Sequence, residues 1–131
     1  MTNGSNPYGI SFADISWLDR LLNGHANVLA ATRHDDILWD IERQHGVAIQ
    51  VICLNEYACG VARVLEVLEV FPDVNLIYVG GVWNCYTTEA KDYCIANHVG
   101  VFNTREMAGA LHKDEFWTYA RRDKEGNPVY C

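Results

Sequence analysis

The chain has 131 residues, half of them hydrophobic, with 17 acidic and 10 basic side chains and a formal net charge of −7. This length predicts one domain with a substantial core, and the charge argues against sequence-independent binding to phosphate backbones, which needs clustered Lys and Arg. No apolar run reaches the roughly 18 residues of a membrane span, and the N-terminus has no basic region followed by an apolar one. We therefore expect a cytoplasmic protein without a membrane partner.

The N-terminal part of the chain predicts a flexible lead over residues 1–10 and then a helix over residues 11–24. Ser11 is a candidate N-cap for this helix. The helix is predicted because apolar side chains recur at helical spacing, namely Phe12, Ile15, Leu18 and Leu22. The next segment, residues 26–32, is short and apolar, and its composition fits a strand or the end of a helical hairpin.

Residues 35–46 have two periodicities. With the period of a helix, Ile37, Leu38 and Ile41 form one apolar face; with the period of a strand, Trp39 takes the place of Leu38. The segment therefore predicts either a helix or the second strand of a hairpin, and the choice decides the fold.

The rest of the chain alternates strands and helices. Buried strands are predicted at residues 47–55, 74–81 and 99–102, and helices at residues 56–71, from Thr87 onward and at residues 105–111. This order predicts right-handed crossovers and a single-domain α/β three-layer sandwich, with a mixed or parallel central sheet and helices on both faces. The domain is predicted to span residues 11–111, and residues 112–131 form a polar tail with an aromatic cluster.

The chain has five cysteines, and none of them forms a C-x-x-C pair. Cys53, Cys59 and Cys94 lie in apolar segments, which predicts reduced and mostly buried thiols. Cys131 is expected to be exposed. The five histidines are scattered without the spacing of metal ligands.

From Val47 onward, roughly half the chain, the order of elements resembles the C-terminal half of the Mrr-type restriction-endonuclease-like domain, a member of the PD-(D/E)XK nuclease superfamily. "VAIQVICLN" stands where the family has the strand with its Q/E-x-K motif, and "YTTEAKDYC" is similar to the family's "F-T-P-E-A" segment. The resemblance implies the hairpin alternative for residues 35–46.

The resemblance also implies a magnesium site. These nucleases hold a divalent metal, usually Mg²⁺, between an Asp and the Glu or Gln of the motif, where the metal polarises phosphate and lowers the pKa of the attacking water. Asp36 or Asp40 would be the Asp and Gln50 the second ligand, and Asp36 lies fourteen residues before Gln50. The implied metal ligands are Asp36 and Gln50.

The motif departs from the family at its lysine, because Ile52 stands at that position. Isoleucine neither orients water nor stabilises developing negative charge. Arg63 is the nearest candidate for a basic residue that has migrated, and Lys91 a more distant one. Alternatively, Arg63 is a solvated helix residue paired with Glu66 or Glu69.

We therefore expect a nuclease-like domain with a degenerate catalytic site, which acts as an interaction module in DNA metabolism or phage defence and needs no cofactor. Tryptophan and tyrosine are plentiful and suit a protein interface, with Trp39, Trp83 and Trp117 as candidate anchors. The first alternative is an active Mg²⁺-dependent DNA endonuclease that uses Asp36, Asp40, Gln50 and Arg63. The sequence leaves a homodimer open.

Two further alternatives remain. A helix at residues 35–46 would give a small flavodoxin-like or Rossmann-like ligand-binding domain, with its site beyond the C-terminal ends of the strands. The polar residues expected there are Thr32, Arg33, His34, Asp35, Asn55, Glu56, Gly80, Gly81 and Asn103. The other alternative is an acidic inhibitor or immunity protein that masks a basic partner.

Overall fold

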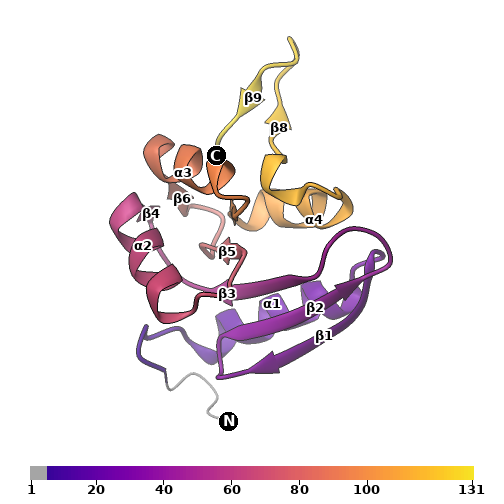
Figure 1. Cartoon of the computed structure of the whole chain (residues 1–131), viewed down its shortest axis with the longest axis vertical. Helices are drawn as coiled ribbons and strands as arrows, with labels where there is room; N and C mark the ends of the chain where they lie inside the picture. Colours follow the sequence, from indigo (N-terminus) through magenta and orange to yellow (C-terminus); the bar gives the residue numbers. More distant parts are fainter. Residues whose placement is uncertain (1–5) are drawn as a thin grey trace.

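The computed structural model describes residues 6–131, and half of the predicted N-terminal lead, residues 1–5, lies outside this range. A five-stranded sheet runs through the molecule in the order β1-β2-β3-β5-β7 (Figure 1). Its strands are β1 (Val28–His34), β2 (Leu38–Arg43), β3 (Ile49–Cys53), β5 (Leu76–Tyr78) and β7 (Gly100–Phe102). The first three strands are antiparallel neighbours, and the last three are parallel, so the sheet is mixed as predicted.

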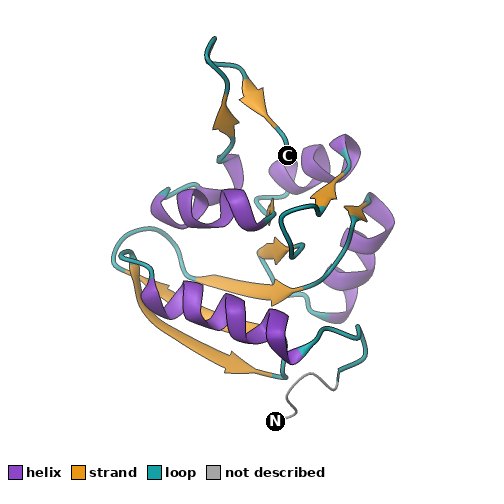
Figure 2. Cartoon of the chain, turned by 180° about the vertical axis from the view of Figure 1, so that it is seen from behind, coloured by secondary structure: helices purple, strands orange, loops and turns teal. Residues whose placement is uncertain are grey.

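Helices on both faces of the sheet complete the predicted three-layer α/β sandwich. They are α1 (Phe12–Gly24), α2 (Val61–Val70), α3 (Thr88–Ala96) and α4 (Thr104–His112). α1 lies against the hairpin of β1 and β2, in front of it in Figure 2. α2 and α3 are the crossovers between the parallel strands, so they share a face and pack against each other. In the described residues no helix is long and apolar enough to cross a membrane.

Smaller elements complete the fold. The strands β4 (Ala58–Cys59) and β6 (Cys85–Tyr86) form a short parallel ladder, and a 3₁₀ turn, η1 (Phe116–Thr118), follows α4. β8 (Arg121–Arg122) and β9 (Pro128–Val129) form a hairpin that projects from the body (Figure 1).

Residues 35–46 contain the second strand of a hairpin, and the alternative of a helix there is wrong. In β2 the buried Trp39 and Ile41 alternate with the exposed Asp40 and Glu42, which is the period of a strand with one covered face. The turn before β2 is made by Asp35 and Asp36, which adopt positive φ angles of 48° and 69°. Aspartate tolerates this left-handed region better than most side chains, so the Asp-Asp pair marks the turn.

Side-chain caps explain where the helices begin. The Ser11 hydroxyl accepts a hydrogen bond from the Asp14 amide at 3.2 Å and starts α1, as predicted. α2 begins later than predicted, at Val61, because residues 58–59 pair with β6 instead. Asn103 and Glu106 form a capping box at the start of α4.

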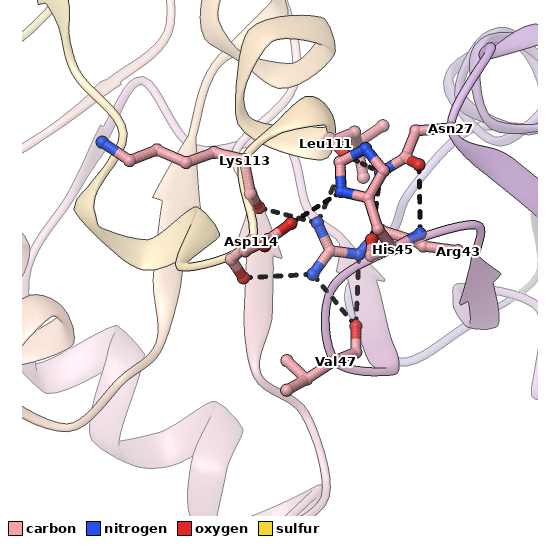
Figure 3. Close-up of polar contacts among 7 residues, drawn as sticks. All are labelled: Asn27, Arg43, His45, Val47, Leu111, Lys113 and Asp114. Atoms are coloured by element: carbon pink, nitrogen blue, oxygen red, sulfur yellow. Dashed lines mark hydrogen bonds and ion pairs between the residues drawn. The ribbon is translucent and has the colours of Figure 1, made fainter.

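Arg43, the last residue of β2, joins the hairpin to the end of α4 (Figure 3). Its guanidinium donates hydrogen bonds of 2.8 to 3.3 Å to the carbonyl oxygens of Val47, Leu111, Lys113 and Asp114. A cation at this place also complements the negative end of the helix dipole. These bonds compensate the burial of a charged side chain that is only 6% exposed.

Candidate functional site

Two of the candidate site residues, Asp40 and Gln50, lie on the face of the sheet opposite α1. The antiparallel register places Asp40 of β2 directly opposite Gln50 of β3, and the Gln50 Nε2 amide donates to Asp40 Oδ1 at 2.9 Å. In the part of the chain that the structure describes, no helix lies in front of β1 and β2 on this side (Figure 1). Directly opposed residues on one sheet face have neighbouring side chains, so the contact follows from the register.

The His34 ring extends this pair on the neighbouring strand. Its Nε2 atom lies 3.2 Å from Asp40 Oδ2, and its Nδ1 atom lies 3.5 Å from the Asp35 carboxylate. The hydrogen bond from Gln50, and secondarily the charge of His34, hold the pKa of Asp40 below its usual value. Asp40 is therefore a carboxylate at neutral pH.

Asp36 lies apart from this pair. It sits at the turn end of the hairpin and is 2% exposed, with Arg33 Nη1 donating to Oδ1 and Asn6 Nδ2 to Oδ2, each at 3.0 Å. Of the two candidate aspartates, the structure thus places Asp40, and not Asp36, beside Gln50. The implied ligand pair of Asp36 and Gln50 is not brought together.

An apolar pair occupies the place where the family motif has its lysine. Ile52 lies two residues after Gln50 on the same face of β3, and its register partner is Leu38. Both side chains are buried, at 0% and 3% exposure. No charge or hydrogen-bond donor is therefore supplied from this position.

Arg63 does not take the place of that lysine. Its guanidinium binds the carboxylate of Glu56 and that of Glu66, the latter at 2.9 Å, and lies over the Tyr8 ring. The expected pairing with Glu66 is confirmed. Arg63 lines a hollow with Tyr8 that is separate from the hollow beside Asp40.

The hollow beside Asp40 and Gln50 has a volume of about 620 Å³ and an acidic wall. Its lining residues are Ala30, Thr32, Asp40, Ile41, Glu42, Ala48, Ile49, Gln50, Asp73 and Asn75. Three of these carry carboxylates and none is Lys or Arg, so the hollow repels phosphate and attracts cationic groups. Within residues 6–131, no three His, Cys, Asp or Glu side chains are placed to hold a metal ion.

The C-terminal ends of the parallel strands carry a second polar cluster, which includes residues expected for the ligand-binding alternative. Asn84 Nδ2 donates to Asn55 Oδ1 at 2.7 Å and to the Val79 carbonyl at 2.9 Å, and Asn103 Nδ2 donates to the Asn84 carbonyl. Gly80 has a φ of 81°, and a Cβ there would meet the Leu54 carbonyl oxygen at 2.7 Å. These groups satisfy one another, so the cluster fixes the loop over residues 80–84.

That loop displays large apolar side chains to solvent. Trp83 is 79% exposed and Val82 48%, and the nearby Tyr57 is 77% exposed. Of the three tryptophans predicted as anchors, Trp83 is thus exposed. Trp39 is fully buried and donates to Asp19, while Trp117 is partly buried and stacks on His98.

Sequence reasoning missed a buried polar cluster around α3. It consists of Lys91, Glu106 and Tyr86, which are 0%, 0% and 5% exposed. Lys91 lies on a helix where a lysine normally faces solvent, so its burial has no signal in the local pattern. A disulfide between Cys85 and Cys131 was also missed, whereas the expected burial of Cys53, Cys59 and Cys94 as free thiols is confirmed.

Comparison of the chain with protein-family models, with curated proteins and with solved structures finds no match.

Proposed function

We propose that the chain is a restriction-endonuclease-like domain with a degenerate catalytic site and that it works by binding a basic protein partner. The observation that carries this proposal is the buried Ile52–Leu38 pair beside Asp40 and Gln50. The two residue types that would ligate a metal are adjacent, but the position that would activate water is apolar. Phosphodiester hydrolysis lacks its basic group there.

The charges around the candidate site support binding to a cationic partner over binding to DNA. Asp40, Glu42 and Asp73 line the hollow, and the whole chain carries a formal charge of −7. The phosphates of a DNA duplex would meet carboxylates at this face. A basic protein surface would be attracted to it and would associate faster at low salt.

The exposed side chains of Trp83, Val82 and Tyr57 support a protein interface. Tryptophan and tyrosine are the residues most often found as energetic anchors of interfaces. The asparagine contacts of Asn84 hold the backbone of residues 80–84, which carries Trp83, in place before a partner arrives, and this lowers the entropic cost of ordering the loop on binding.

The alternative is a Mg²⁺-dependent DNA endonuclease that uses Asp40 and Gln50 with Arg63 as its basic residue. A rearrangement would be needed, because Arg63 is held by two glutamates. Isothermal titration with Mg²⁺ and Mn²⁺ separates the two functions. We expect no binding at millimolar metal and no cleavage of supercoiled plasmid.

The matched variants are Asp40→Ala, Gln50→Ala and Asp36→Ala. Metal binding that the first two substitutions abolish and the third leaves intact, together with plasmid cleavage, would replace our proposal by the endonuclease.

The partner side of the proposal is tested by affinity capture from cells that express the tagged chain. We expect one basic protein that is released by salt, is lost with Trp83→Asp and is kept with Leu65→Asp, a control at another exposed apolar side chain. Loss with both variants, or with neither, would contradict an interface at Trp83.

A further inference from the structure

The buried lysine on α3 is enclosed mainly by aromatic rings. Lys91 Nζ donates to the Val101 carbonyl at 3.1 Å, its one hydrogen bond to another residue that the structure gives. The ring centroids of Phe102, Tyr86 and Tyr130 lie 4.2, 4.9 and 5.7 Å from Nζ. Attraction to ring faces partly replaces the water that an ammonium loses on burial.

A carboxylate lies close enough to this ammonium to favour its charged form. Glu106 accepts a hydrogen bond of 2.5 Å from the Tyr86 hydroxyl and one of 3.0 Å from the Asn103 amide. Burial nevertheless dominates and lowers the pKa of Lys91 to about 8, against the opposing effect of Glu106. The cluster therefore brings an amine, a phenol and a carboxylate together away from solvent.

One of the three enclosing rings belongs to a segment with few other contacts. Residues 121–131 are all exposed, and β8 and β9 pair only with each other. The hairpin leaves the body beyond α4, and its second arm returns toward α3 (Figure 1). The segment meets the body again at its end, where Tyr130 packs edge-on against Tyr86 at 6.3 Å.

A covalent bond holds that end in place. Cys131 forms a disulfide with Cys85, the residue before Tyr86, across 46 positions of sequence. Cys85 is partly exposed and Cys131 exposed, so a thiol from solution has access to the bond. The buried thiols of Cys53, Cys59 and Cys94 have no such access, and burial raises their pKa values.

We propose that Tyr130 and Cys131 form a thiol-released cover over Lys91. In the oxidised protein the Cys85–Cys131 bond keeps the Tyr130 ring over the amine. In the reduced protein the exposed segment leaves, because the contacts of the Tyr130 ring with Tyr86 and Lys91 and the hydrogen bond between the Cys131 backbone and Tyr86 do not offset the entropy of ordering residues 121–131. Lys91, Tyr86 and Glu106 then open to solvent.

The chemistry of release is ordinary thiol–disulfide exchange with a dithiol reductant. One reductant thiolate attacks a sulfur of the Cys85–Cys131 bond and forms a mixed disulfide, and the other protein sulfur leaves as a thiolate. The second reductant thiol then displaces the protein sulfur. Two electrons pass to the protein disulfide, two protein thiols form after protonation, and the reductant becomes a disulfide.

The test compares the reactivity of lysines toward an amine-acetylating reagent in the oxidised and reduced full chain. The chain has three lysines, and the exposed Lys113 and Lys124 are internal references in the same sample. Peptide mass spectrometry gives the rate at each site. We expect Lys91 to react roughly tenfold or more faster after reduction, as for a local opening, while the two references keep their rates.

Two variants separate the tether from the ring. Cys131→Ser should make Lys91 reactive without any reductant. Tyr130→Ala, with the disulfide intact, should give an intermediate rate because the ring is lost but the segment stays attached. Neither residue belongs to the face that carries Asp40 and Gln50, so this test is independent of the proposed function.

Three results would overturn the proposal. The first is an air-oxidised protein in which peptide mass spectrometry finds no disulfide-linked peptides containing Cys85 and Cys131. The second is a Lys91 that stays unreactive when both cysteines are alkylated. The third is an alkylation of Cys53 and Cys94 that accelerates on reduction by the same factor as the acetylation of Lys91, since those buried thiols become accessible only when the core opens.

Discussion

Two polar clusters, each with one carboxylate at its centre, lie in opposite environments in this molecule. Asp40 and Gln50 stand on an open sheet face, where water competes for every hydrogen bond, and the Asp40 side chain is 62% exposed. Lys91 and Glu106 lie under the C-terminal segment and are 0% exposed. The family resemblance directs attention to the first cluster, but the larger electrostatic energies belong to the second, because burial removes the screening of charge.

The largest expected effect is the loss of Glu106. The substitution Glu106→Ala removes the partner of the Tyr86 hydroxyl, the acceptor of the capping box and the carboxylate near Lys91. Each of the two buried donors left without its acceptor costs about 1 to 3 kcal/mol, and the ammonium of Lys91 loses the carboxylate near it. Urea unfolding measures the total cost, with the exposed Glu42→Ala as the matched control. Equal small losses in both variants would remove the contrast between the clusters.

The next effect is a dependence of stability on pH that comes from Lys91. Its pKa is lowered to about 8 in the folded protein, mainly by burial, from the ordinary lysine value of 10.5. Between these values the unfolded chain binds more protons, so the contribution of Lys91 to stability rises with pH from 8 to 10.5 and is lost as the pH falls.

This pH dependence is measured as the difference in the free energy of unfolding between wild type and Lys91→Met. Wild type should gain roughly 1 to 3 kcal/mol relative to Lys91→Met over that pH range. Comparing the two removes the opposing contribution of the buried thiols, which both proteins share. A difference that stays constant with pH would show that Lys91 has an ordinary pKa in the fold.

A smaller effect is expected at the open face. Asp40→Ala should cost a few tenths of a kcal/mol, because the Asp40–Gln50 contact is exposed. The lowered pKa of Asp40 means that this contribution is present above the unfolded value near 4 and disappears as the pH falls through the folded one. A double-mutant cycle with Gln50→Ala measures the coupling, and a coupling above about 2 kcal/mol would contradict this weak interaction.

The smallest effect on stability is expected for Trp83→Ala, because the ring is 79% exposed. The change should leave the unfolding midpoint within error and remove most of the iodide-accessible tryptophan fluorescence, with a smaller accessible part left from Trp17, which is 37% exposed and stacks on Tyr78. Trp39→Phe provides the contrast, since Trp39 is buried and hydrogen-bonded to Asp19. Quenching that is as strong without Trp83 as with it would show that another tryptophan is the most exposed one.

More of the fold than of the candidate site could be predicted from the sequence. The periodicity of residues 35–46 left a helix and a strand open, and only the family resemblance favoured the hairpin; the structure shows the alternation of a strand at Trp39, Asp40 and Ile41. Once the hairpin is given, the contact of Asp40 with Gln50 follows from the antiparallel register of β2 and β3. The local pattern is informative here because each residue alternates between a covered and an open face.

The rest depends on contacts between segments far apart in the chain. Lys91 has the sequence context of a surface helix, and its burial is decided by Phe102, Tyr86 and Tyr130 together. An odd number of cysteines does not say which two pair, and Cys85 and Cys131 meet only because the final hairpin turns back. Such features are properties of tertiary packing, for which a local pattern has no signal.

The hydrogen bonds of Arg43 to the end of α4 influence the order in which the chain folds. Its guanidinium finds its carbonyl partners 68 to 71 positions further along the chain, at Leu111, Lys113 and Asp114. Until those residues arrive, the end of the first hairpin keeps a hydrated charge, and closing so long a loop is slow. Docking of α4 therefore supplies the last hydrogen bonds of the first hairpin. In a chain that stops short of Leu111, Arg43 at the end of β2 lacks these acceptors.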